Sequence, residues 1–287
     1  MRIMNGQLKS VNAIQKFSVG SVLGCTFRTL RQNPVVYFGL SFLAVVLSII
    51  PRLIFDDTFG TFGSFFIFVF PHVADMAIQG SIAYAVYLGM KGQTATINNA
   101  LQQSIHRLHV IIPASAVVLI FIIMGIFVSI AVFIGISGFF FPVIDFFSKI
   151  VGTKVSVFFF TTIAASMFTF TCFIIASMYL VTVHACVIEK LGINAALKRS
   201  IDLTDGYCLQ IFLLLFIAFL TSSMVTGGVS FVTTLITWER AVLEKIAVSL
   251  FSLAFTAFTC VMYSIIYYNL RTAKEGASLD NLAKMFD

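Results

Sequence analysis

The chain has 287 residues, of which 59% are hydrophobic and 10% are charged, and its formal net charge is +6. Soluble domains usually carry about 25% charged residues, so this composition and a mean hydropathy of +1.02 exclude an ordinary soluble domain. No polar stretch is long enough to fold by itself. We therefore expect a single transmembrane domain over residues 1–287, all-α and integral to the membrane.

Six apolar runs follow one another along the chain. They cover roughly 35–55, 64–90, 110–136, 156–187, 207–227 and 245–269. Because about 20 residues of helix cross a bilayer core, each run is long enough to span it. The sequence therefore predicts six transmembrane helices.

A short pattern precedes the first, third and fifth apolar runs. It reads Val/Ile, two residues, Ala/Val-Leu, two residues, Ser/Thr and then Ile/Phe. Spacings of three and four place these residues on one helical face, which predicts a short amphipathic helix lying on the membrane, here called an elbow helix. The three copies are Val19, Val22, Leu23, Thr26, Phe27; Ile97, Ala100, Leu101, Ser104, Ile105; and Ile193, Ala196, Leu197, Ser200, Ile201.

The order of elements predicts an internal repeat. Each unit is an elbow helix followed by a transmembrane hairpin, so the fold is three repeats at about 17–91, 92–188 and 189–272, with a cytoplasmic tail at 273–287. Since two crossings separate successive copies, all three elbow helices must lie on the same side of the membrane.

Lysine and arginine indicate which side that is. Thirteen of the 18 basic residues lie on the elbow side, and the opposite connections carry five, namely Arg52, Lys149, Lys154, Arg240 and Lys245. Cytoplasmic loops are enriched in Lys and Arg. We therefore expect a multi-pass protein whose elbow helices and both termini are cytoplasmic.

The second apolar run contains an unusual polar group. His72, Asp75 and Gln79 follow a proline at spacings of three and four, so they share a helical face. An ionisable side chain at membrane depth is costly and is a functional candidate by default. One interpretation is a proton or cation site in which His72 and Asp75 exchange a proton. The other is a structural clasp, in which Asp75 bonds His72 or a neighbouring helix, or lies in the first turn of a helix that begins near Pro71.

The same run carries a small residue at every fourth position. These residues are Ala77, Ser81, Ala85 and Gly89. Small residues let another helix approach closely, so we expect this run to be a central packing helix.

Charged residues gather at the elbows. The candidates for contacts to lipid headgroups or within an elbow are Arg28, Arg31, Arg107, Glu189, Lys198 and Arg199. Basic side chains at the cytoplasmic face attract the phosphates of anionic lipids. Within the third elbow, Glu189 is also positioned to bind Arg199 and brace the turn, and we favour this structural role.

Polar and aromatic residues close the fourth and sixth runs. A lone histidine such as His184 is interpreted as a hydrogen-bonded packing residue. Tyr263, Tyr267 and Tyr268 are interpreted as anchors at the membrane interface, where amphipathic aromatics are enriched.

The sequence contains none of the motifs that name a reaction. It has no Gly-rich phosphate loop, no Gly-x-Ser-x-Gly elbow, no His-Glu-x-x-His and no Cys-x-x-Cys pair. The five cysteines share no metal-like spacing and are interpreted as small apolar residues. We therefore expect no catalytic residue, no cofactor, no metal and no nucleic-acid partner.

Several short motifs resemble a group of bacterial six-span membrane proteins. They are Val187-Ile188-Glu189-Lys190-Leu191-Gly192, Ala196-Leu197-Lys198-Arg199-Ser200, Leu203-x-x-Gly206, the closing Tyr267-Tyr268-Asn269-Leu270-Arg271-x-x-Lys274-Glu275-Gly276, and the opening Phe17-Ser18-Val19-Gly20 leading to Asn33-Pro34. The group includes the YciC-like proteins and the membrane domain attached to some glycerophosphodiester phosphodiesterases. The resemblance implies a six-span protein of the bacterial inner membrane. It does not imply hydrolysis, which belongs to a separate soluble domain.

These observations predict a non-enzymatic inner-membrane protein that organises lipids or a membrane-protein partner. The alternative is a transporter or channel with its site around Asp75. A third class, an enzyme acting on lipid inside the membrane, requires His72 and Asp75 to converge with His184 or Glu189 on one cleft.

Overall fold

The computed structural model describes residues 18–55, 60–139, 149, 152–235 and 240–275, and within them it is helical without a strand. The all-α prediction is confirmed. The N-terminal residues 1–17 and the tail beyond 275 lie outside the described residues, so the predicted cytoplasmic location of the two ends remains a prediction.

The helices follow the predicted order. Short helices cover the three copies of the pattern: α2 (Val19–Gln32), α5 (Ile97–His106) and α10 (Ile193–Thr204). The long helices are α3 (Pro34–Ile54), α4 (Gly60–Met90), α6 (Leu108–Phe139), α8 (Thr153–Tyr179), α11 (Cys208–Leu235) and α12 (Arg240–Glu275), and the short α9 (Thr182–Ile188) follows α8.

Two long elements differ from the expected runs. The fourth run divides into α8 and α9, because a turn at Leu180 and Val181 redirects the chain so that all seven residues of α9 are buried. The fifth run does not end at Gly227 and Gly228, since α11 continues to Leu235. A Cβ atom on either glycine would meet nothing within 4 Å, so no neighbour stops the helix there.

Five stretches of helix in the described residues are long and apolar enough to cross a membrane. They are Pro34–Pro51, Leu108–Gly135, Thr162–Ile188, Cys208–Thr233 and Ile246–Glu275. This confirms a multi-pass membrane protein. The second predicted run forms α4, which is not among the five stretches.

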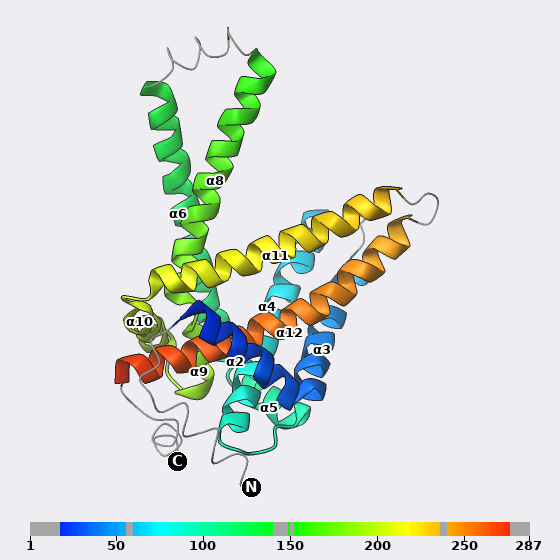
Figure 1. Ribbon diagram of the computed structural model, residues 1–287, viewed down its shortest axis with the longest axis vertical. Coiled ribbons are helices and arrows are strands. Elements are labelled where there is room, and N and C mark those ends of the chain that lie inside the picture. Colours follow the sequence, from blue (N-terminus) through cyan, green and yellow to red (C-terminus); the bar gives the residue numbers. More distant parts are fainter. Residues whose placement is uncertain (1–17, 56–59, 140–148, 150–151, 236–239, 276–287) are drawn as a thin grey trace.

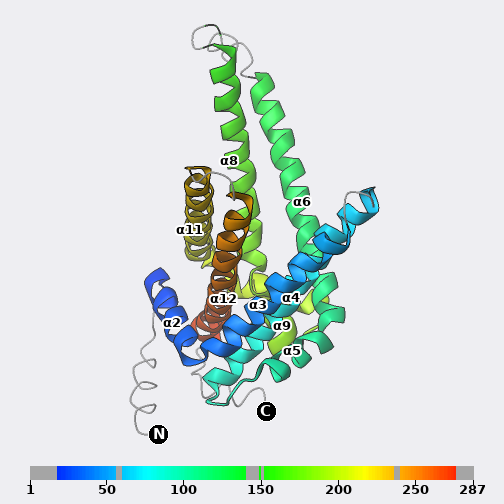
Figure 2. The same cartoon turned by 90° about the vertical axis from the view of Figure 1, so that its right-hand side faces the viewer.

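The long helices form three hairpins that converge at one end and diverge at the other (Figures 1 and 2). The hairpins are α3 with α4, α6 with α8, and α11 with α12. The helices α2, α5, α9 and α10 gather at the converging end. The outer part of α6 is largely exposed, including Phe127 and Val128, as expected for a surface that faces lipid acyl chains.

The core lies where the hairpins converge. The second half of α12 supplies Met262, Ile265 and Ile266, and α4 supplies Ile78 and Ile82, all of them almost fully buried. Removing apolar surface from water contributes roughly 25 cal/mol per Å². Surface buried from lipid does not gain this free energy, because lipid is itself apolar. Close packing of small and large residues therefore stabilises this end.

Candidate functional site

The elbow helices begin at the same position of the pattern. Each starts at its first residue, and the preceding residue is the N-cap: Ser18, Thr96 and Gly192. The Ser18 hydroxyl accepts a hydrogen bond from the Ser21 backbone N–H, and the Thr96 hydroxyl accepts one from the Asn99 backbone N–H. These caps satisfy backbone donors that a helix leaves free at its start, whereas Gly192 makes no side-chain cap.

The elbow helices also bury the same two positions. Val22, Ala100 and Ala196 are fully buried, and so are Thr26, Ser104 and Ser200 four residues later. The Ser104 hydroxyl donates to the Ala77 carbonyl of α4 at 2.7 Å, and the Ser200 hydroxyl donates to the Met178 carbonyl of α8 at 2.8 Å. Thr26 differs, because its hydroxyl donates to the carbonyl of Val22 within α2.

A glycine allows the closest of these contacts. A Cβ atom on Gly80 would lie 2.6 Å from the Ser104 hydroxyl oxygen and 3.1 Å from a methyl group of Val187. The small-residue ladder contributes Ala77, Ser81 and Ala85, which are buried. The close approach, however, occurs at Gly80, which lies outside that ladder.

Beside the third elbow, four charged side chains form a closed ring, here called the charged junction: Glu189, Arg199, Arg271 and Glu275. Arg199 Nε lies 3.1 and 3.0 Å from the two carboxylate oxygens of Glu189, and its Nη2 binds Glu275 Oε1. Arg271 Nε donates to Glu275 Oε2 at 2.8 Å, and Arg271 Nη1 lies 3.6 Å from Glu189 Oε1. Each arginine therefore bridges both carboxylates.

Tyr267 adds two hydrogen bonds to the charged junction. The Tyr267 hydroxyl donates to Glu189 Oε1 at 2.6 Å and accepts from Arg271 Nη1 at 3.1 Å. The His184 ring stacks on Tyr267 with centroids 5.8 Å apart, and its Nε2 lies 3.2 Å from the Ser264 hydroxyl. The junction thus connects α9, α10 and α12.

The charged junction keeps its arginines ionised. Burial lowers the pKa of Arg199, but hydrogen bonds with Glu275 and Glu189 raise that pKa above its ordinary value. The side chain of Arg271 is only 4% exposed, and that of Glu189 is 12% exposed. A buried arginine needs such carboxylate partners, so the junction is a structural brace rather than an open binding site.

These contacts correct one interpretation and support two others. Tyr267 and Tyr268 are buried and are not interface anchors, because Tyr267 supports the charged junction and both pack in the core. The pairing of Glu189 with Arg199 is present as expected, and His184 is a buried, hydrogen-bonded packing residue.

The sequence interpretation missed that Arg271 and Glu275 complete the brace. A usable signal existed: Tyr267, Arg271 and Glu275 are spaced by four and share one face of α12. Their partners outside α12 are Glu189 at the end of α9 and Arg199 on α10, so the pattern alone did not indicate that they meet.

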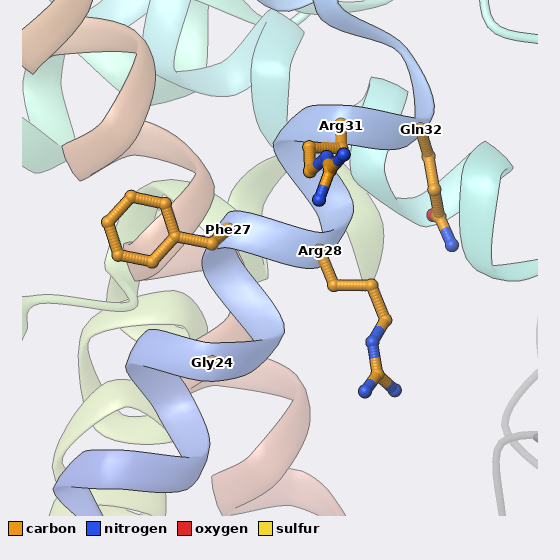
Figure 3. A pocket seen from close by; sticks show the side chains of 5 residues that line it. All are labelled: Gly24, Phe27, Arg28, Arg31 and Gln32. Carbon is orange, nitrogen blue, oxygen red and sulfur yellow. The ribbon is translucent and has the colours of Figure 1, made fainter.

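The basic residues of the first elbow surround an open groove, here called the basic groove. It has a volume of about 440 Å³ and is lined by Gly24, Phe27, Arg28, Arg31 and Gln32. Figure 3 shows Arg28, Arg31 and Gln32 extending from the last turns of α2, with Phe27 extending in another direction. Arg28 and Arg31 are exposed, and neither makes an ion pair or hydrogen bond with a described residue.

The remaining elbow candidates are placed differently. Arg107 Nη1 donates to the Lys190 carbonyl at 3.5 Å and so connects the second elbow to the turn after α9. Lys190 adopts a left-handed backbone with φ of 55°. Lys198 is exposed on α10.

A second groove of about 520 Å³ lies between α4 and α5 and has a largely neutral polar lining that includes Gln93, Asn99, Gln102, Gln103 and His106.

The polar cluster of α4 forms no clasp in the described residues. Asp75 is exposed near the middle of the helix, and His72 and Gln79 are half-buried. No hydrogen bond or ion pair with a described residue holds the Asp75 carboxylate. None joins His72 or Asp75 to His184 or Glu189 either. In the described part of the chain, no three His, Cys, Asp or Glu side chains are grouped to hold a metal.

Comparison with known proteins does not assign this chain to a family. No family model, curated protein or solved structure matches it.

Proposed function

We propose that this chain is a non-enzymatic protein of the bacterial inner membrane that organises lipids, or a partner protein, at the cytoplasmic face. One observation carries the proposal. The three elbow helices gather at one end of the molecule, where Arg28 and Arg31 of the first elbow are exposed and make no ion pair with a described residue. Exposed cationic side chains at a membrane surface attract anionic lipid phosphates.

The order of helix contacts supports the proposal that the fold consists of three repeats. α5 packs on α4, α10 packs on α8 and α9, and α2 packs on α12, so that each elbow helix contacts the hairpin before it and the first contacts the last. The hairpins touch in the same cyclic order, α4 with α6, α8 with α11 and α12 with α3. A triplicated unit closed around an axis accounts for this order.

In this proposal α4 also crosses the membrane, which brings the number of spans from five to six. Its 31 residues correspond to about 46 Å of helix, which exceeds the roughly 30 Å thickness of a bilayer core. With six spans, the excess of Lys and Arg on the elbow side makes that side cytoplasmic. The motifs shared with the YciC-like group are consistent with this arrangement.

Native mass spectrometry and lipid analysis of the full chain test the proposed function. The protein is extracted with its surrounding lipid and compared with an unrelated six-span protein prepared in the same way. We expect anionic phospholipid, or one reproducible protein partner, to be enriched. If neither lipid nor protein is enriched over the control, the proposed function is wrong.

A second candidate function is transport of protons or cations. It is favoured by the exposure of Asp75 near the middle of α4, where His72 is its electrostatic neighbour but no hydrogen bond or ion pair with a described residue holds it, because an ionisable group at that depth is costly unless it is used. The test is ion or proton flux into proteoliposomes. Flux that is present in the wild type and lost in Asp75→Asn supports this function, and absent or unchanged flux excludes it.

A further inference from the structure

The three elbow helices use their arginines differently. On α10, Arg199 is held by Glu189 and Glu275, and beside α5, Arg107 donates to a backbone carbonyl. On α2, Arg28 and Arg31 have neither kind of partner among the described residues. The first elbow is therefore the one whose guanidinium groups are available to a ligand.

The arrangement of these two arginines suits an oxyanion. Arg28 and Arg31 are three residues apart and extend from the same end of α2, with Gln32 beside them (Figure 3). Guanidinium groups bind phosphate in a bidentate manner, and an amide adds a further donor. A Cβ atom on Gly24 would meet nothing within 4 Å, so the adjoining wall of the groove is open.

An apolar stripe begins directly after the basic groove. Val35, Phe38 and Phe42 are spaced by three and four on α3 and are 75%, 38% and 58% exposed. They lie in Pro34–Pro51, one of the stretches apolar enough to cross a membrane. Only one residue separates the end of α2 from the start of α3, so the helix that carries the basic groove and the helix that carries the apolar stripe are adjacent along the chain.

We propose that α2 and α3 together bind one anionic phospholipid, with its phosphate at Arg28, Arg31 and Gln32 and an acyl chain along Val35, Phe38 and Phe42. This inference rests on the proposed function and deepens it by naming a lipid class and one of the three elbows. A free phosphate ion would use the arginines but not the apolar stripe.

Native mass spectrometry of the full chain in detergent tests the inference. The probes are phosphatidylglycerol, phosphatidylcholine and inorganic phosphate, each titrated against the wild type and three variants that each remove one positive charge: Arg28→Gln, Arg31→Gln and, as the matched control on the third elbow, Lys198→Gln. We expect the wild type to prefer phosphatidylglycerol. Because a charge-assisted hydrogen bond is lost, Arg28→Gln and Arg31→Gln should each weaken that binding by about tenfold or more, whereas Lys198→Gln should change it less than about twofold.

The apolar half of the site has its own test. Phe42→Ser removes part of the stripe and should weaken binding of long-chain phosphatidylglycerol while leaving binding of a water-soluble short-chain form unchanged. Both arginine variants and Phe42→Ser alter exposed side chains, and an unchanged thermal unfolding midpoint shows that each variant is folded.

The outcomes separate this inference from the proposed function. If the wild type prefers phosphatidylglycerol but Arg28→Gln and Arg31→Gln behave like Lys198→Gln, the site on α2 is wrong and the lipid-organising function stands. Displacement of the lipid by inorganic phosphate at the same concentration would overturn the lipid assignment in favour of a soluble anion. Equal affinity for both lipids would overturn the inference, and the function would then depend on the co-purification result.

Discussion

Arg199 and Arg271 bind the same two carboxylates, those of Glu189 and Glu275, although they lie on different helices. The four side chains therefore form a closed ring in which each neighbour along the ring has the opposite charge. Separating α10 from α12 would break the ring at two places, so the brace resists movement of the third elbow relative to the last helix.

Replacing Arg271 with Gln should destabilise the protein strongly. The change removes a guanidinium whose side chain is 4% exposed and leaves Glu189 and Glu275 with one cationic partner fewer. Breaking a fully buried pair costs about 3–5 kcal/mol. Because Arg199 and Glu275 are each about a quarter exposed, we expect a lower figure, about 2–3 kcal/mol, in the free energy of unfolding measured in mixed detergent.

The matched control for that change lies three residues further along α12. Lys274 Nζ is 3.8 Å from Asp205 Oδ2, and the two side chains are 33% and 83% exposed. Exposed pairs contribute about 0–1 kcal/mol, so Lys274→Gln should be nearly neutral. Equal losses for both variants would show that the charged junction is not a brace.

Replacing Gly80 with Ala should displace the second elbow. The added Cβ would lie 2.6 Å from the Ser104 hydroxyl oxygen, so α5 must move away from α4 or the serine must lose its bond to the Ala77 carbonyl. Overpacking of this kind costs about 1–3 kcal/mol. The readout is the thermal unfolding midpoint of Gly80→Ala in a chain that keeps Ser104.

Gly20→Ala provides the comparison, because a Cβ atom there would meet nothing within 4 Å. Alanine is favoured over glycine in a helix by up to about 1 kcal/mol, so this variant should be unchanged or slightly more stable. A Gly80→Ala protein as stable as Gly20→Ala would contradict the close approach of the two helices.

Removing the buried elbow hydroxyls should cost less, and unequally. Ser104→Ala and Ser200→Ala each delete a hydrogen bond to the carbonyl of another helix. A bond of this kind contributes roughly 0.5–1.5 kcal/mol. In Thr26→Val, only a bond within α2 is lost, and we expect a smaller change in unfolding free energy. The idea of a shared docking role in the second and third elbows fails if Thr26→Val is the most damaging of the three.

All three elbow helices should be accessible from one side of the membrane. Single cysteines at Gly20, Gln102 and Lys198, introduced in a cysteine-free background, place one reporter on each elbow. A membrane-impermeant maleimide should label all three only when it has access to the cytoplasmic face. Labelling of any two from opposite faces would refute the six-span arrangement. If α4 did not cross the membrane, the chain would have five spans, and Gly20 would be labelled from the face opposite to Gln102 and Lys198.

The spacing pattern predicted that a short helix covers each elbow, although not the residue at which it begins, and the predicted bounds of the long helices were less precise. Val19, Ile97 and Ile193 begin both the sequence pattern and the helices, because capping and one-sided burial are local properties of neighbouring residues. The break before α9 and the continuation of α11 past Gly228 were not predicted. A uniformly apolar run contains no local sequence signal for a turn. The turn before α9 is accompanied by burial of α9 among other helices, which depends on residues far away in the chain.

The amino-acid order by itself determined that this protein is helical and membrane-embedded, and that a short helix covers each copy of the pattern. Those properties depend on composition and on spacings within one turn or two of helix. Only the tertiary structure decided that Tyr267 lies inside rather than at the interface, that Arg271 and Glu275 complete the charged junction around Arg199, and that Arg28 and Arg31 have no such partners among the described residues. The physical reason is that the carboxylate which satisfies a cation can lie on a helix far away in the chain, and only packing brings the two together.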